Sequence, residues 1–119
     1  MSAGQLWLFP PAKPLVERFG EDFFRQLPER PGVYLFCGRT EGVLYVGMAK
    51  NLRKRIGSYR VANPERFSRR IIRLMQRVER IEYDECPDEQ AAAYREELLI
   101  CVLNPRFNRA GNVWPKPDR

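Results

Sequence analysis

Apolar and polar residues follow two different periods along the chain, and each change of period marks a predicted element. Residues 33–37 and 43–47 are short apolar runs rich in Val, Tyr, Leu and Phe, joined by a connection that contains Gly and Thr. This pattern predicts two strands with a turn between them. Residues 78–85 set apolar Val, Ile and Tyr among charges, which predicts a third, partly exposed strand.

Four other segments have the three-to-four-residue apolar spacing of amphipathic helices. Pro28 is expected to end the first of them, in which Gly20 is a weak point, because residues before proline avoid the α region. Asn63 followed by Pro64 is a helix start signal, and Asp88 can cap the last helix. The predicted helices cover residues 15–27, 51–60, 64–77 and 88–103. Together with a three-stranded, mostly antiparallel sheet, they predict an α+β fold, a small α/β sandwich.

The chain of 119 residues is long enough for one small domain with a modest core. We expect residues 1–27 to be an N-terminal arm and helix packed on a domain of residues 28–108, and residues 109–119 to be an extended tail. The apolar cluster at residues 6–9 either packs against the domain or docks a protein partner. The start of the chain does not resemble a signal peptide, and no apolar run reaches the roughly 20 residues of a membrane span. We therefore expect a cytoplasmic protein without membrane contact.

The net charge of +6 is distributed unevenly along the chain. Residues 50–80 contain 11 of the 21 basic residues and only two glutamates, so this segment carries +9 and the remainder −3. A segregated, arginine-rich block favours a polyanion as partner, although a solvated helix face is the alternative. The basic residues expected to bind DNA are Lys50, Arg53, Lys54, Arg69, Arg70 and Arg73.

The chain contains no histidine, which excludes a histidine base and any histidine-containing zinc site. Its three cysteines are odd in number and widely spaced, as expected of reduced thiols. Hydrolytic chemistry here would need another base and a hard metal held by oxygen. The sequence contains no Gly-rich phosphate-binding loop, so nothing in it indicates a small-molecule cofactor.

One carboxylate occupies an unusual position on the last predicted helix. At 100° per residue, Glu96 shares its face with Ala92, Leu99, Ile100 and Leu103. A carboxylate on an apolar face is costly unless it is paired or bound to a metal. Both a buried Glu–Arg pair and a metal site are consistent with this position.

Two tripeptides, Gly32-Val33-Tyr34 and Tyr45-Val46-Gly47, resemble the signatures of the GIY-YIG nuclease family. Arg55 lies eight residues after the second one, Glu96 lies twelve residues before Asn108, and the helix is followed by a closing Pro-Arg-Phe-Asn. The resemblance runs from about residue 27 to residue 108. It is greatest to the nuclease domain that opens the bacterial excinuclease C subunit of nucleotide excision repair.

The resemblance implies a metal-dependent DNA endonuclease that acts in DNA repair or on structured DNA. Glu96 would hold one Mg²⁺ or Mn²⁺, and Arg55 would grip the nonbridging phosphate oxygens. In the absence of histidine the base would be a phenol, for which we favour Tyr45 assisted by Tyr34. A free phenol titrates near pH 10, so the metal and Arg55 would have to lower the pKa of the base. Tyr59 and Asn108 match positions that contact phosphate and brace the site.

The chain departs from the family pattern in two respects. Met48 follows the second tripeptide, where excinuclease-type domains usually carry lysine, and Lys50 could reach the same place. The second nuclease domain and the DNA-binding modules of excinuclease C subunits are not found in the sequence, so the chain resembles a free-standing nuclease domain. Two alternatives remain open: a catalytically weak DNA-binding module, and an adaptor subunit of a larger repair or mobile-element complex.

Overall fold

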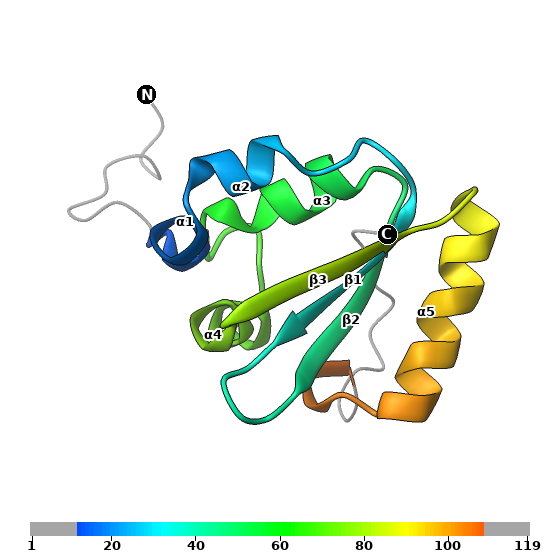
Figure 1. Ribbon diagram of the computed structural model, residues 1–119. Helices are drawn as coiled ribbons and strands as arrows, with labels where there is room; N and C mark the ends of the chain where they lie inside the picture. The colour runs from blue at the N-terminus through cyan, green and yellow to red at the C-terminus, as the bar shows by residue number, and fades with distance from the viewer. Residues whose placement is uncertain (1–11, 109–119) are drawn as a thin grey trace.

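The computed structural model describes residues 12–108, which fold around a three-stranded sheet (Figure 1). The strands are β1 (Gly32–Cys37), β2 (Val43–Ala49) and β3 (Arg80–Glu85), in the order β2-β1-β3, and both pairings are antiparallel. The three predicted strands and the α+β class are confirmed. β3 starts two residues later than predicted because Arg80 pairs with Cys37, where β1 ends.

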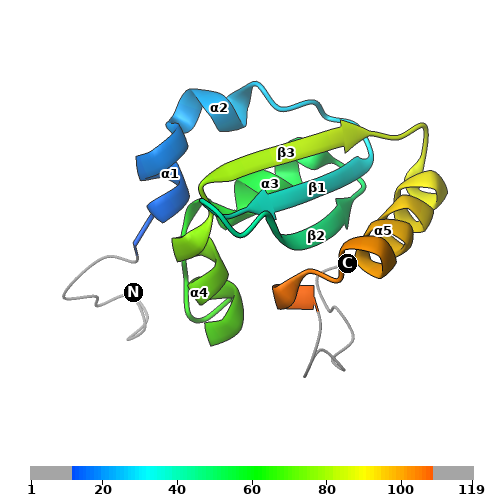
Figure 2. The same ribbon diagram turned by 60° about the horizontal axis from the view of Figure 1, so that its bottom comes forward.

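Helices surround the sheet unevenly. In Figures 1 and 2 four short helices group together, and the long helix α5 stands apart from them. α5 contacts β2 and β1. None of the helices among residues 12–108 is long and apolar enough to cross a membrane. The helices are α1 (Pro14–Phe19), α2 (Glu21–Arg25), α3 (Leu52–Gly57), α4 (Arg69–Arg77) and α5 (Glu89–Leu103), with 3₁₀ turns η2 (Ser58–Arg60) and η3 (Arg106–Asn108).

The prediction of one helix over residues 15–27 is wrong. The chain forms α1 and α2 instead, which meet at Gly20 with φ 84° and ψ 157°. A positive φ of this kind is accessible to glycine but strained for other residues, so the helix breaks there. α2 ends at Arg25, before Pro28 can act as the terminator.

The predicted helix over residues 64–77 starts later than expected. Asn63 does accept a hydrogen bond from a backbone amide, that of Glu65 at 2.9 Å, but the result is a turn. The helix begins after Ser68, whose hydroxyl accepts from the amide of Ile71 at 3.2 Å. The predicted helix over residues 51–60 divides into α3 and η2, whereas Asp88 caps α5 as predicted.

The main core lies between the sheet and the group of four short helices. Tyr34 and Phe36 of β1 pack there with Leu52 of α3 and Leu74 of α4. On α5 only Ala92 and Glu96 are buried. Leu103, on the same helix face as Glu96, is 42% exposed, so the buried part of this face lies nearer the start of α5.

Both signature glycines are required by close approach of other atoms. Gly32 pairs with Glu85 of β3, and a Cβ atom there would lie 2.3 Å from the carbonyl oxygen of Asp84. Gly47 lies opposite Tyr34, and a Cβ atom there would lie 2.3 Å from Cζ of that ring. The ring of Tyr34 therefore crosses β2 at the only residue type that leaves room for it.

We predict that Gly47→Ala destabilises the domain by about 2–3 kcal/mol, because the added methyl group displaces the buried Tyr34 ring. Gly57→Ala is the matched control, since a Cβ atom there is 3.8 Å from its nearest neighbour, Nε of Arg60. We expect the control to leave stability unchanged or to raise it by up to about 1 kcal/mol, because alanine favours a helix. Urea unfolding of both variants measures the difference, and equal stabilities would contradict the close approach.

Candidate active site

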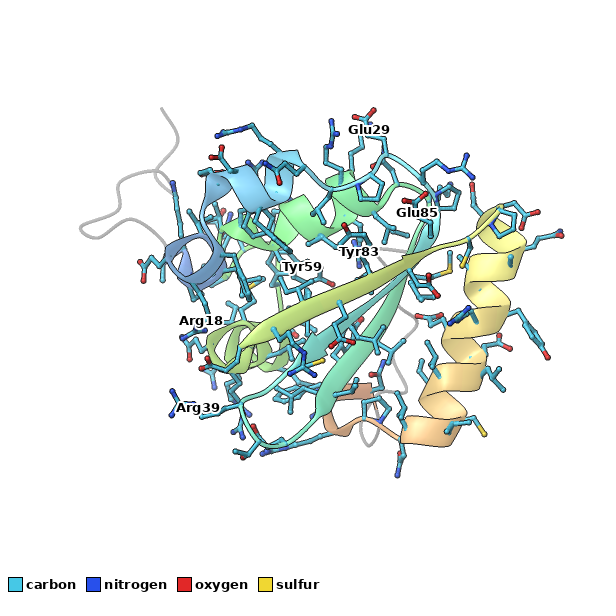
Figure 3. The ribbon with its side chains drawn as sticks, viewed as in Figure 1. Arg18, Glu29, Arg39, Tyr59, Tyr83 and Glu85 are labelled. Carbon is cyan, nitrogen blue, oxygen red and sulfur yellow. The ribbon has the colours of Figure 1, made fainter. Side chains whose placement is uncertain are left out.

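Two buried phenols and one guanidinium form a hydrogen-bonded cluster beneath α3. The hydroxyl oxygens of Tyr34 and Tyr59 are 2.8 Å apart, and both residues are 1% exposed. Nε of Arg55 donates to the hydroxyl oxygen of Tyr34 at 3.3 Å. The guanidinium carbon of Arg55 also lies 5.6 Å from the centre of the Tyr59 ring, within range of a cation–π interaction. Figure 3 shows Tyr59 between α3 and the sheet.

Local sequence explains how α3 presents this cluster. Asn51 accepts a hydrogen bond from the amide of Lys54 at 3.1 Å and fixes the start of the helix directly after β2. Leu52 and Ile56 bury their side chains in the core and hold the helix against the sheet. Arg55 and Tyr59 are four residues apart, so the helix and the following 3₁₀ turn place both near Tyr34.

Tyr45 belongs to the same aromatic group. It is 3% exposed, and its ring centre lies 6.3 Å from that of Tyr34 and 6.2 Å from that of Phe36. The Tyr59 ring packs edge-on against Phe36 and stacks on Phe67. The sheet, α3 and η2 thus bring together both signature tyrosines, Arg55 and Tyr59.

Asn108 holds the outer edge of β2 beside Tyr45. Its side-chain oxygen accepts from the backbone amide of Val46 at 2.8 Å, and its side-chain nitrogen donates to the carbonyl of the same residue at 2.9 Å. These two bonds imitate a neighbouring strand at the free edge of the sheet. Asn108 therefore fixes the backbone between Tyr45 and Gly47.

Glu96 is the one charged residue that is buried among residues 12–108, with 1% of its surface exposed. It lies on α5, one turn after Ala92, on the side that contacts β2 and β1. In this part of the chain no three His, Cys, Asp or Glu side chains form a metal-binding group. A metal at Glu96 would therefore draw its other ligands from water and substrate, as Mg²⁺ commonly does.

A cleft of about 640 Å³ separates α3 from the start of α5. Arg55 reaches both the buried tyrosines and this cleft. Met48 of β2 contributes to the lining as well. The remaining lining residues are Ala49, Lys50, Asn51, Lys54 and Ser58 on the side of β2 and α3, and Glu89, Gln90 and Ala93 on α5.

Four of the six residues expected to bind DNA fall into two groups. Lys50 and Lys54 line the cleft, and Arg69 and Arg73 are exposed on α4. Arg53 is divided between structural and surface roles, because it donates to the carbonyl of Leu27 at 2.7 Å and pairs with Glu29 at 3.2 Å.

Arg70 is held by internal contacts instead of projecting from α4. It donates to the carbonyl of Arg106 at 3.0 Å, and its guanidinium carbon lies 5.6 Å from the centre of the Phe107 ring. Arg106 lies at a similar distance, 5.5 Å, from the same ring. Sequence reasoning also did not single out Ser58, Gln90 or Ala93 as cleft residues. Of these three, only Ser58 had a signal in the sequence, because it lies between Arg55 and Tyr59, which were both predicted to belong to the site.

Burial changes the acid–base behaviour of Tyr59. Desolvation, followed by the neighbouring phenols of Tyr34 and Tyr45, raises the pKa of Tyr59 well above its usual value, and Arg55 offsets this only in part. Tyr59 therefore stays protonated at neutral pH and can donate its hydroxyl hydrogen to Tyr34. Two donors, Arg55 and Tyr59, are then available to the oxygen of Tyr34.

Comparison with known proteins identifies related domains. Residues 30–109 match the model of a protein family described as the UvrC-like GIY-YIG domain. The UvrABC system protein C of Maricaulis maris is 40% identical over 87 residues, which are 73% of this chain and 13% of that protein. The protein of the same name from Aromatoleum aromaticum is 41% identical over 86 residues, 72% of this chain and 14% of that protein. The chain thus spans a small part of the length of these relatives.

A solved structure has the same fold. It is the GIY-YIG N-terminal endonuclease domain of UvrC from Thermotoga maritima, bound to its catalytic divalent cation, magnesium. The sequence identity is 30% and the TM-score is 0.64, and the match covers 74% of this chain and 93% of that one. The likeness therefore extends over nearly the whole of that domain.

We predict that Tyr59 makes the stability of the domain depend on alkaline pH. Above about pH 10 the unfolded chain releases the Tyr59 proton and the folded chain keeps it, so the stabilisation present below pH 10 is lost as the pH rises. Tyr59→Phe should make this loss shallower by up to about 1.4 kcal/mol per pH unit. Urea unfolding at pH 9, 10 and 11 measures it. Tyr94→Phe, at a site 70% exposed, is the control, and an equal change there would contradict the role of burial.

Proposed function

The chain belongs to the family of UvrC-like GIY-YIG domains, and on that premise we propose that it is a metal-dependent endonuclease that hydrolyses phosphodiester bonds in DNA. The observation that carries the proposal is that Arg55 contacts the tyrosine cluster and the cleft at the same time. This side chain bonds to a buried signature tyrosine and also lines a cleft whose α3 wall is cationic. A phosphate in the cleft would therefore meet the positive charge that is attached to the phenol cluster.

Glu96 is the residue proposed to hold one Mg²⁺ or Mn²⁺. A single carboxylate fits these ions, which keep several waters and bind substrate phosphate, better than it fits zinc or calcium. When bound, the ion would polarise the scissile phosphate and stabilise charge on the leaving 3′ oxygen. The burial of Glu96 in α5 would fix the position of its carboxylate relative to β2.

Arg55 would bind the nonbridging oxygens of the scissile phosphate. Its Nε atom donates to Tyr34, and a guanidinium carries several N–H donors in a planar fork that matches the geometry of phosphate. The hydrogen bond and the contact with the Tyr59 ring restrict the rotamers of Arg55 before substrate arrives. A guanidinium positioned in advance loses less entropy when the phosphate binds.

Tyr45 is our choice for the base that takes a proton from the attacking water. The hydroxyl of Tyr34 is already engaged by Arg55 and Tyr59, which favours an orienting role for Tyr34. The two tyrosines lie side by side on adjacent strands, and Asn108 holds the backbone next to Tyr45. In this proposal Tyr59 and Asn108 are supporting residues that keep the two reactive side chains in place.

DNA in repair or in branched intermediates is the proposed substrate. The relatives are named as proteins of the UvrABC system, and the solved neighbour is described as an endonuclease domain, which supports action in nucleotide excision repair or a related pathway. Such a role would place the chain in the bacterial cytoplasm. A protein partner that delivers the DNA is proposed as well, since the relatives are named as proteins of the UvrABC system.

A second candidate is a DNA-binding module with weak or no cleavage. Met48 lines the cleft beside Arg55, and a thioether can neither donate a hydrogen bond to phosphate nor supply positive charge. In that case the cleft would still bind DNA through Lys50 and Lys54. Met48→Lys would then create cutting that the parent chain lacks.

We predict metal-dependent cutting of at least one DNA in a panel of plain duplex, nicked, bubble, flap and four-way-junction substrates. The assay runs in Mg²⁺, in Mn²⁺ and in EDTA. Glu96→Gln and Tyr45→Phe should each lower the rate by about 100-fold or more, because they remove the metal ligand and the base. The controls are Glu97→Gln, next to Glu96 but exposed, and Tyr94→Phe, also exposed.

If each control variant loses as much cutting rate as the site variant it is compared with, the assigned roles of Glu96 and Tyr45 are excluded. Salt-sensitive binding without cutting in either metal ion would favour the second candidate, and recovery of cutting by Met48→Lys would then identify the missing group.

A further inference from the structure

Three clefts follow one another along α3 and η2, and basic side chains line each of them. The first is the active-site cleft of about 640 Å³. The second, of about 310 Å³, shares Lys54 and Ser58 with the first and adds Arg25. The third, of about 480 Å³, shares Gly57, Ser58 and Arg60 with the second. It extends to Lys13, to Glu21 of α2 and to the turn before α4. We call the three together the α3 groove.

We propose that the α3 groove binds the sugar-phosphate backbone of the DNA strand on one side of the scissile bond. This inference rests on the proposed function, because the groove starts at the cleft that contains Arg55. Clefts of this volume are of the size that holds a small molecule, so they suit one strand at a time. The groove would therefore guide a single strand away from the active site.

The charge of the groove is suited to a polyanion. Eight lysines and arginines line it, against two glutamates, Glu21 and Glu89. A positively charged groove that follows the backbone is the common way in which proteins bind single strands. Each phosphate that is neutralised releases counterions, so the affinity should fall steeply with salt.

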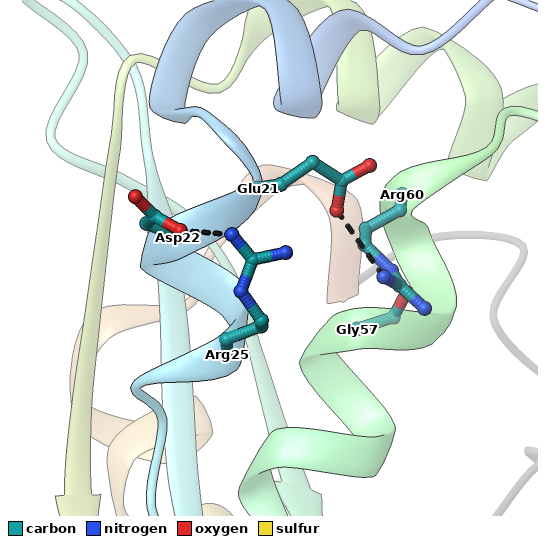
Figure 4. Close-up of polar contacts among 5 residues, drawn as sticks. All are labelled: Glu21, Asp22, Arg25, Gly57 and Arg60. Carbon is teal, nitrogen blue, oxygen red and sulfur yellow. Dashed lines mark hydrogen bonds and ion pairs between the residues drawn. The ribbon is translucent and has the colours of Figure 1, made fainter.

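Several arginines of the groove already contact exposed carboxylates. Arg60 pairs with Glu21 at 3.3 Å, and Arg25 pairs with Asp22, as Figure 4 shows. The side chains of Arg60 and Glu21 are 47% and 45% exposed, and such exposed pairs contribute little to stability. A phosphate can therefore take the place of the carboxylate. Glu21 thus occupies Arg60 in the free protein and would compete with a DNA phosphate for it.

Arg60 is oriented toward the groove by a second contact. Its Nε atom donates to the carbonyl of Gly57 at 2.9 Å, at the end of α3. This bond does not involve Glu21, so it remains when a phosphate replaces the carboxylate. Arg60 therefore lines both the second and the third cleft in an orientation that does not depend on Glu21.

The α3 side is a better candidate for the strand than α4. On α4, Arg70 is bound to the carbonyl of Arg106, and Arg77 pairs with Glu41. These contacts hold η3 and the β1–β2 turn against the helix. The α3 groove, by contrast, begins at the cleft that Arg55 lines.

The test compares two variants that break the same ion pair. Arg60→Gln should weaken binding of a labelled 20-nucleotide single strand by about 5-fold or more at 0.1 M salt, and should lower the slope of log K against log salt by about 0.7. Glu21→Gln should instead strengthen binding, because it frees Arg60 for phosphate. A pair that only stabilises the fold would change affinity in the same direction in both variants.

The controls use Arg80 and Glu82, an exposed pair on β3 that does not line the groove. Arg80→Gln and Glu82→Gln make the same changes in net charge and report the long-range effect of charge alone. Thermal unfolding verifies that all four variants are folded. The proposal is overturned if Arg60→Gln equals Arg80→Gln, or if Glu21→Gln binds no more tightly than Glu82→Gln.

Binding is measured in EDTA, so the result does not depend on cutting. If the wild-type chain cuts DNA but the groove variants bind like their controls, the groove inference fails and the proposed function stands. If the groove variants change binding as expected and no substrate is cut, the proposed function fails and the groove inference stands.

Discussion

The hydrogen bond from Arg55 to Tyr34 is the constraint on which the arrangement of this domain depends. It joins α3 to the central strand, and through the hydroxyl of Tyr34 it reaches Tyr59 in η2. A guanidinium half-buried among aromatic rings would be costly without such partners, because charged groups need hydrogen bonds when they leave water. The same side chain forms part of the cleft wall. Arg55 therefore both stabilises the fold and contributes to the proposed active site.

The backbone of the sheet makes room for this cluster. Gly47 leaves space for the ring of Tyr34, and Gly32 lets β3 and Leu52 approach β1 closely. On the outer edge, Asn108 supplies the two hydrogen bonds that a fourth strand would have supplied to Val46. The two tripeptides and the closing asparagine are thus parts of one packing arrangement, which explains why they occur together although they are far apart in the sequence.

Much of this could be predicted from the sequence, where the determining signals were local. The alternating and apolar runs located all three strands, and Asp88 was identified as a cap from its position before α5. The start of α4 was missed, because both Asn63 and Ser68 are good capping residues, and in the structure Asn63 caps only a turn whereas Ser68 caps the helix. Gly20 was noted as a weak point, yet its positive φ could not be read from helical spacing.

The site shows the same limit. The resemblance to a family identified Tyr34, Arg55 and Tyr59, and the fold brings them into contact. Sequence could not show that Arg70 is bound to Arg106, or that Arg60 faces the same groove as Arg25, because these relations link segments far apart in the chain. The basic block was recognised as a whole, but its division into structural and exposed arginines required the fold.

A double-mutant cycle on Tyr34 and Arg55 tests most directly whether the phenol–guanidinium cluster is the catalytic unit. Single-turnover cutting of the best DNA substrate would be measured for Tyr34→Phe, Arg55→Gln and the double variant. If the two side chains act as one unit, the double variant is scarcely slower than the slower single variant, because either change already disables the pair. Independent effects that multiply in the double variant, or single variants that cut as fast as the wild type, would contradict a catalytic unit built on this hydrogen bond.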